Sequence, residues 1–213
     1  MTSSTRADRE PLVLLVATGL VLLWSGIGPY DRLVWWLEVA PVLLGAPICV
    51  ASYSSFRLSP LIYRLLFVHA VILMIGAHYT YARVPAGFWA QDVFDLSRNH
   101  YDRLGHVAQG FVPAMLAREI LIRRSPLEPG RWLFFLVVCF CLAFSAFYEM
   151  VEWWAALIGG ESADSFLATQ GDVWDTQWDM FLALLGAIGA QLLLTSTHDR
   201  SMADAAIAPR PAR

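Results

Sequence analysis

Long apolar runs separated by short polar segments dominate the chain. One crossing of a bilayer requires about 20 mostly apolar residues. Six runs of about this length lie at residues 11–28, 33–51, 60–81, 101–122, 131–158 and 178–197. The pattern predicts an all-α integral membrane bundle of six transmembrane helices. The fourth run carries Gln109, Gly110 and Pro113, so we expect it to face protein rather than lipid.

The same pattern defines one domain with two polar ends. The predicted transmembrane domain covers residues 11–197, after a polar lead at 1–10 and before a disordered tail at 198–213. Two connections, at residues 82–99 and 160–177, are longer than a simple turn requires. Long ordered loops are often functional, so these two are the connections of interest.

Composition and charge support the membrane class and orient the bundle. With 57% hydrophobic and 15% charged residues, a soluble fold is disfavoured. A cytoplasmic N-terminus would place eleven of the fifteen basic residues inside, which favours an N-in/C-in topology. The low basic content argues against nucleic-acid binding and leaves membrane lipids as the expected partners. The sequence does not specify an oligomeric state.

Acidic side chains interrupt three of the apolar runs at helical spacing. Residues four and seven positions apart share one face of a helix. Small residues let helices approach closely in a membrane, so a stripe containing Ala183, Gly186 and Ala190 should face the bundle interior. The polar stripes are Asp102, His106 and Gln109 in the fourth run, Glu149 and Glu152 in the fifth, and Asp175 and Asp179 at the start of the sixth.

With the predicted topology, the polar ends of all three stripes lie under the outer interface. His78, Arg103, Asp172 and Glu38 fall at the same level. We therefore expect one outer-facing pocket of His, Asp and Glu side chains. His69, in the middle of the third run, is instead expected to be a hydrogen-bonded interior histidine. His198 is expected to be a loop or interface residue.

Ionised carboxylates at membrane depth cost several kcal/mol each unless they are paired. Three kinds of partner remain open. A divalent metal suits carboxylate and imidazole ligands, arginines such as Arg103 and Arg83 would form ion pairs, and protonation would suit a proton-coupled carrier. The candidate metal ligands are His78, His106, Glu149, Glu152, Asp175 and Asp179, with Asp102, Gln109 and Asp172 completing the pocket.

Four segments resemble the YjdF family of bacterial inner-membrane proteins. They are HYTYA at 78–82, RNHYDRLGHVAQGFVPAMLAREI at 98–120, SAFYEMVEWWAAL at 145–157 and ADSFLATQGDVWDTQWDMFLALLGA at 163–187. The last is the most specific, because Thr-Gln-Gly-Asp followed by Trp-Asp-Thr-Gln is an improbable chance run. The resemblance implies a multi-pass protein of the inner membrane and no particular activity.

A fainter similarity reaches VanZ-like membrane proteins, which are associated with glycopeptide resistance. Asp102, Arg103 and His106 match an Asp-basic-x-x-His motif of that group. Glu152 stands where that pattern has Gln, and Ala183 where it has Asn. The similarity implies a shared architecture and no transferable activity.

Three functions follow from these alternatives, and the residues do not decide whether the protein is an enzyme. The first is a metal-assisted enzyme acting on a lipid or polyprenyl-phosphate headgroup, with His106, Glu149 and Glu152 in acid–base or ligand roles and Arg103 as a phosphate clamp. The second is a non-catalytic protein that binds a lipid or envelope component and whose acids form a structural ion-pair network. The third is a small proton-coupled carrier.

Overall fold

Helices account for nearly all of the described chain. The computed structural model describes residues 3–159 and 169–205. Within these ranges no strand is present, so the predicted all-α class is confirmed. The helices are α1 (Ser3–Ser25), α2 (Arg32–Ser52), α3 (Pro60–Tyr79), the 3-10 turn η1 (Tyr81–Arg83), α4 (Pro85–Phe94), α5 (Tyr101–Arg124), α6 (Arg131–Gly159) and α8 (Asp175–Asp204).

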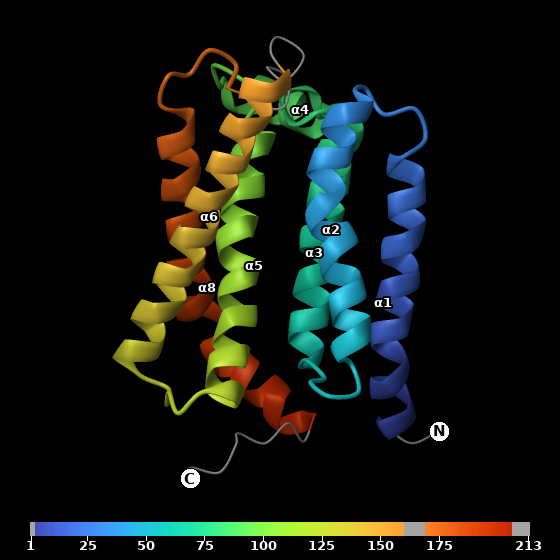
Figure 1. Cartoon of the computed structure of the whole chain (residues 1–213), viewed down its shortest axis with the longest axis vertical. Coiled ribbons are helices and arrows are strands. Elements are labelled where there is room, and N and C mark those ends of the chain that lie inside the picture. Colours follow the sequence, from blue (N-terminus) through green and yellow to red (C-terminus); the bar gives the residue numbers. More distant parts are fainter. Residues whose placement is uncertain (1–2, 160–168, 206–213) are drawn as a thin grey trace.

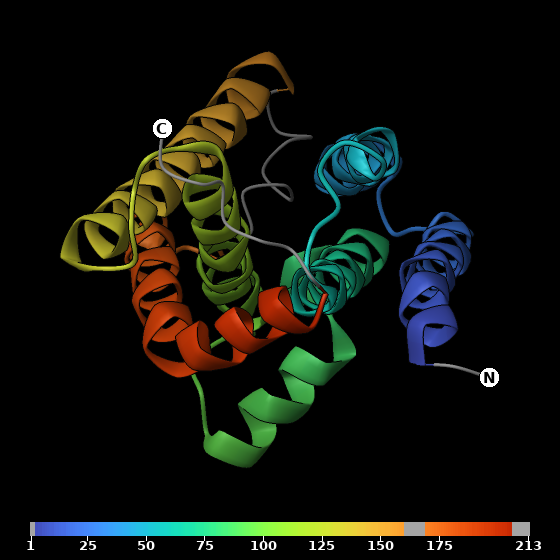
Figure 2. The ribbon, with the colours of Figure 1, turned by 90° about the horizontal axis from the view of Figure 1, so that it is seen from below.

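The long helices run alongside one another, and α4 lies across one end of the bundle (Figures 1 and 2). We refer to this end as the α4 end. The start of α1 and the end of α8 both lie at the opposite end. Helix α5 is central, because it packs against α3, α6 and α8, while α3 connects it to α1 and α2.

The surface of the bundle suits a lipid environment. Helices α2, α3, α6 and α8 are long and apolar enough to cross a membrane. Large apolar side chains such as Leu44, Phe140 and Leu192 are exposed on them, and continuous exposed apolar surface marks an interaction surface, here with lipid. The predicted spans at 11–28 and 101–122 correspond to α1 and α5, which are not among these four.

Glycines bring α5 and α8 into close contact. A Cβ atom at Gly110 would lie 1.8 Å from the carbonyl oxygen of Ala183, and one at Gly186 would lie 2.2 Å from that of Val107. Small residues permit this approach of two helix backbones. The predicted inward stripe is confirmed, because Ala183 and Ala190 are fully buried and Gly186 is buried as well.

Several helix boundaries differ from the prediction. Helix α1 begins at Ser3, inside the predicted polar lead, and α8 begins at Asp175 and continues to Asp204. Residues 198–204 of the predicted tail are therefore helical. The reason is packing, because His198 is fully buried and Met202 joins the apolar core. The remaining predicted tail, 206–213, lies outside the described residues.

The predicted loop at 82–99 contains an additional helix, α4. Its start is held by Asn99, whose amide nitrogen donates to the carbonyl of Val84 at 3.0 Å and whose amide oxygen accepts from the backbone of Tyr101. Gly87 packs directly against Asn99, since a Cβ there would lie 1.8 Å from Oδ1. The helix exposes large apolar side chains, as helices lying in a membrane interface do. These side chains are Phe88, Trp89, Val93 and Phe94.

Candidate functional site

The polar stripes of α5, α6 and α8 meet at one imidazole near the α4 end. Nε2 of His106 lies 3.6 Å from Oδ1 of Asp102 and 3.9 Å from Oδ2 of Asp179. Its other nitrogen, Nδ1, lies 2.9 Å from Oε1 of Gln109 and 3.8 Å from Oε1 of Glu149. Three helices that are distant in sequence therefore supply one cluster, centred on His106.

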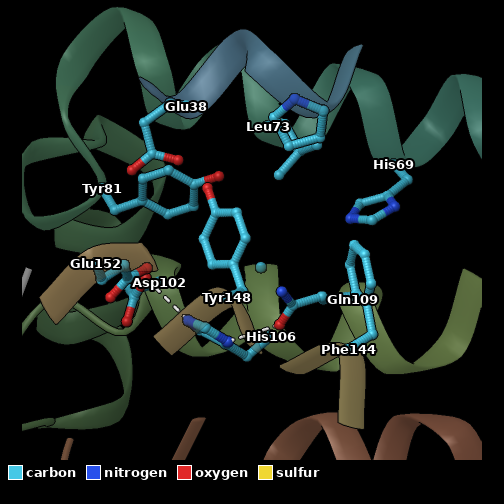
Figure 3. Close-up of a pocket in the computed structure, with 12 residues that line it drawn as sticks. Glu38, His69, Leu73, Tyr81, Asp102, His106, Gln109, Phe144, Tyr148 and Glu152 are labelled. Carbon is cyan, nitrogen blue, oxygen red and sulfur yellow. Dashed lines mark hydrogen bonds and ion pairs between the residues drawn. The ribbon is translucent and has the colours of Figure 1, made fainter. Parts of the chain in front are cut away.

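Gln109 determines which nitrogen of His106 is available. An amide oxygen can only accept, so the Nδ1–H of His106 donates to Oε1 of Gln109. In the neutral ring the lone pair then belongs to Nε2, which faces Asp102 and Asp179. Figure 3 shows the amide nitrogen of Gln109 directed away from His106. Histidines that bind metals commonly donate their second N–H in this way.

Two overlapping groups could hold a metal ion. One consists of Asp102, His106 and Asp179, the other of His106, Glu149 and Glu152, each with ligand atoms within 4.8 Å of one another. A tetrahedral ion with bonds of about 2.1 Å would hold its ligand atoms about 3.4 Å apart. The 3.6 and 3.9 Å distances in the first group approach this spacing. The nitrogen that faces Glu149 is engaged by Gln109, so the first group is the better metal site.

The acids in and next to this cluster have no arginine partner in the described chain. Asp102 and Glu149 are 7% exposed, Asp179 2% and Glu38 4%. Oδ1 of Asp179 and Oε1 of Glu149 are buried without a hydrogen-bond partner. Among the ion pairs of residues 3–159 and 169–205, none joins an arginine to one of these four acids. Buried oxygens without partners are costly, and a bound cation is one kind of group that would give them a partner.

A cavity of about 40 Å³ lies beside His106, between α2, α3, α5 and α6 (Figure 3). Since about 10 to 15 Å³ suffices for one water molecule, it has room for a few waters. Glu38, Glu152 and two tyrosines that the sequence analysis did not single out, Tyr81 and Tyr148, contribute to its wall. Tyr81 belongs to η1, a short 3-10 turn for which the sequence has no periodic pattern. Tyr148 lies in an apolar run, where an aromatic residue does not stand out.

His69 lines the same cavity from α3. Its Nε2 atom is buried and has no hydrogen-bond partner. The prediction of a hydrogen-bonded interior histidine is therefore wrong for this nitrogen. In Figure 3 the ring lies near Phe144 at the end of the cavity away from Glu38 and Glu152. The sequence feature that indicates this location is that His69 lies in the middle of a membrane helix, where polar side chains usually face an interior space.

Two arginines near the α4 end, Arg98 and Arg103, form ion pairs with Asp175 and Asp172. Arg98 donates to Oδ1 of Asp175 at 2.6 Å, and Arg103 donates to Oδ2 of Asp172 at 2.9 Å while its guanidinium lies over the ring of Trp178. Asp172 therefore pairs with Arg103 rather than with His106, and Arg103 is engaged rather than free to clamp a phosphate. Asp175, one turn before Asp179 on α8, is buried and pairs with Arg98. Neither arginine forms an ion pair with Asp102, Glu149 or Asp179.

The Thr-Gln-Gly-Asp segment, residues 169–172, fastens the start of α8 to the start of α5. Gln170 donates to the carbonyl oxygen of Asn99 at 2.7 Å and accepts from its backbone N–H. Gly171 has a φ angle of +85°, a conformation that favours glycine. Nearby, burial together with the positive charges of Arg103 and Arg98 lowers the pKa of His100. The motif has a structural explanation.

His78 was expected among the ligands of the cluster, and the structure corrects this placement. Its Nδ1 lies 3.0 Å from the carbonyl oxygen of Ser25, and its ring stacks on Trp24 with centroids 4.7 Å apart. The α1–α2 connection also bonds to the end of α3, since the N–H of Tyr30 donates to the carbonyl of His78. His78 therefore faces α1 rather than His106. Arg83, the other proposed ion-pair partner, lies over the ring of Tyr30.

A second buried polar cluster lies at the opposite end of α5. Glu119 accepts from Nε2 of His198 at 2.9 Å, from Arg123 at 2.6 Å and from the backbone N–H of Ser59 at 2.9 Å. Arg118 donates to Nδ1 of His198 at 2.8 Å. His198 was expected in a loop or at the interface, and it is instead fully buried. Each charged side chain of this network has a charged or hydrogen-bonding partner, in contrast to the cluster around His106.

Fold and site together define a polytopic α-helical membrane protein with a buried cluster of carboxylates around an imidazole. The chain belongs to a family described as predicted membrane proteins (DUF2238), whose model matches residues 10–200. It is 49% identical over 196 residues to the inner membrane protein YjdF of Escherichia coli (strain K12), covering 91% of this chain and 94% of that protein. The predicted YjdF resemblance and inner-membrane location are confirmed. These comparisons do not show the fainter VanZ-like similarity, and no solved structure matches.

Proposed function

We propose that this protein is a metal-dependent enzyme of the inner membrane that acts on the headgroup of a lipid. In this proposal Asp102, His106 and Asp179 hold one divalent ion. The two carboxylates neutralise the charge of the ion, which suits a site at membrane depth. Imidazole and carboxylate ligands are compatible with zinc, manganese or iron.

The observation that carries the proposal is the environment of His106. Its Nδ1–H is engaged by Gln109, and its Nε2 faces Asp102 and Asp179 at 3.6 and 3.9 Å. Among the described ion pairs, His106 is the one basic side chain that contacts Asp102 and Asp179, since Arg98 and Arg103 pair with Asp175 and Asp172. A bound metal ion would add positive charge beside these carboxylates.

A metal ion at this site can polarise a phosphoryl or carbonyl oxygen and can activate a bound water molecule. Glu149 and Glu152 lie on the adjacent face of α6, and Glu149 is 3.8 Å from the His106 ring. Either carboxylate could accept or return a proton during such a reaction. Arg103 has no role in this proposal because it is paired with Asp172.

The proposed topology places the site near the lipid headgroups of the outer leaflet. All six long helices would cross the membrane, with the start of α1 and the end of α8 both on the cytoplasmic side. The start of α1 and the end of α8 lie at the same end of the bundle, which supports an even number of crossings. Eleven of the fifteen basic residues would then be cytoplasmic, as the positive-inside rule favours.

Elemental analysis of the purified protein tests the metal site. After loading with Zn²⁺ or Mn²⁺ and removal of excess metal, we expect about one ion per chain. In His106→Gln, metal content should fall by about tenfold or more, because even outer-shell changes cost 10- to 100-fold in affinity. Asp92→Asn, which removes an exposed acid of α4, is the control and should retain the ion. Equal metal content in wild type and His106→Gln would contradict the proposal.

Turnover is tested with the metal-loaded protein in vesicles of phosphatidylethanolamine, phosphatidylglycerol and a polyprenyl phosphate. Mass spectrometry of the lipids should show a modified headgroup that does not form after chelation or in His106→Gln. If the ion is bound and every headgroup stays unchanged, the enzymatic part of the proposal is wrong. If no ion binds and Glu149→Gln chiefly lowers stability, the cluster is structural.

A further inference from the structure

A membrane-facing groove runs between α6 and α8 beside the proposed metal site. Its volume of about 450 Å³ lies in the range of small-molecule pockets. Four of its residues follow helical spacing along α6, and the other two are one turn apart on α8. The lining residues are Ala146, Glu149, Met150, Trp153, Thr176 and Met180.

The lining of the groove indicates an amphiphilic occupant. Met150 and Trp153 are 43% and 58% exposed on helices with the composition of membrane spans, so lipid chains are the molecules adjacent to them. Methionine adapts its shape to flexible apolar ligands. Trp153 lies toward the α4 end of α6, and tryptophan favours the level of the lipid headgroups. The groove therefore fits an acyl chain that extends from that level into the bilayer.

Glu149 gives the groove its chemical selectivity. It is the one charged residue of the lining, it is 7% exposed, and its Oε1 atom has no hydrogen-bond partner. An ionised carboxylate only accepts hydrogen bonds, so its complement is a donor, and a cationic donor also offsets its charge. A primary ammonium group meets both requirements, whereas a headgroup without a cation does not. Glu149 is also 3.8 Å from His106, so a headgroup bound there adjoins the proposed metal site.

We propose that the groove between α6 and α8 binds an aminophospholipid, with one acyl chain along the groove and the headgroup ammonium hydrogen-bonded to Glu149. This inference rests on the proposed function and narrows its substrate to lipids with a primary amine. The groove is the lateral route by which the headgroup reaches the site from the bilayer.

Photo-crosslinking with phosphatidylethanolamine that carries a diazirine in one acyl chain tests the groove. In nanodiscs of phosphatidylglycerol, the probe should label the α6 and α8 peptides that contain Met150 and Met180. Unlabelled phosphatidylethanolamine should compete, and further phosphatidylglycerol should not. Ala146→Phe fills the groove and should lower this labelling about tenfold, since overpacking a fitted site costs on the order of one decade in affinity. Phe147→Trp enlarges an exposed residue at the same depth outside the lining and should label like wild type.

Glu149→Gln separates recognition of the headgroup from simple insertion of the chain. This variant should still be labelled but should lose the preference for phosphatidylethanolamine over phosphatidylglycerol. Unchanged labelling in Ala146→Phe would overturn the proposed lipid groove. Equal competition by phosphatidylethanolamine and phosphatidylglycerol in wild type would overturn it as well. Metal content measured on the same Ala146→Phe preparation distinguishes the two proposals, because an intact metal site with unaltered labelling rejects only the lipid groove. Absence of metal from wild type rejects the proposed function whatever the labelling shows.

Discussion

Helix α5 carries a buried polar cluster at each end, and the two clusters are built differently. At the end away from α4, Glu119 is surrounded by His198, Arg123 and the backbone N–H of Ser59, and Arg118 completes the network. At the α4 end, acids outnumber the cations near them, and His106 is the only basic side chain in contact with Asp102 and Asp179 among the described ion pairs.

The difference separates a structural role from a ligand-binding role. Where buried charges satisfy one another, removing one partner strands the rest. Buried acids without partners are costly and are retained where something else binds them. On the same helix, the cluster around Glu119 is self-contained, whereas the cluster around His106 is incomplete. Substitutions that change one cluster at a time test this difference.

The largest expected effect is at the self-contained cluster. Glu119→Gln should lower the free energy of unfolding by about 3 to 5 kcal/mol, because His198 and Arg123 lose a buried partner. Denaturation in mild detergent measures this loss. The folded fraction of the variant should still bind one metal ion per chain. A variant as stable as wild type would mean that this network does not hold the helices together.

Asp179→Asn should behave in the opposite way. Without metal, the variant should be at least as stable as wild type, because it replaces a buried carboxyl group whose Oδ1 atom has no hydrogen-bond partner. With metal at about 100 times its dissociation constant, wild type should gain about 2.7 kcal/mol and the variant should not. Thermal melts with and without Zn²⁺ measure both quantities. Strong destabilisation of the metal-free variant would show that the two clusters are alike.

A third change tests the contact between α5 and α8 that positions both clusters. Gly186→Ala places a Cβ against the carbonyl oxygen of Val107 and should destabilise the protein by about 1 to 3 kcal/mol. Gly189→Ala is the matched control, since nothing lies within 4 Å of its added Cβ. It should be neutral or slightly stabilising, because alanine favours helix more than glycine does. Equal effects of the two substitutions would contradict the close packing at Gly186.

The smallest effect is expected at Gln109, which acts on the site through His106. Gln109→Leu should keep the fold and weaken metal affinity by about tenfold, because the ring loses the acceptor that fixes its tautomer. Competition with a fluorescent zinc chelator measures the affinity. Gln191→Leu is the control, since Gln191 is a buried glutamine on α8 that donates to backbone carbonyls. Its metal affinity should match wild type.

Much of the bundle follows from hydrophobic periodicity, because each long helix of the described chain corresponds to an apolar run. The stripe of Asp102, His106 and Gln109 was predicted from helical spacing alone. The ion pairs of Asp172 and Asp175 were not, because their partners Arg103 and Arg98 lie 69 and 77 positions away and meet them only in the folded chain. Sequence distance also obscured the second cluster, since 79 positions separate Glu119 from His198.

The misplaced residues share a physical cause. His78 is near the end of α3, which ends at Tyr79. The next residue, Thr80, has a φ angle of +60° and interrupts the helix. Spacing predicted its level in the bundle but not which neighbour it faces, and α1 supplies the carbonyl and the ring that hold it. Tyr81 enters the cavity because it follows this break. Irregular backbone of this kind has no periodic signal in the sequence.

The most direct measurement is electron paramagnetic resonance of the protein loaded with Mn²⁺, with pulsed detection of nitrogen nuclei near the ion. The account predicts about one Mn²⁺ per chain, coupled to a single imidazole nitrogen, and loss of that nitrogen signal in His106→Gln. It also predicts that His78→Gln leaves the signal unchanged. A chain that binds no Mn²⁺, or a nitrogen signal that persists in His106→Gln, would contradict it.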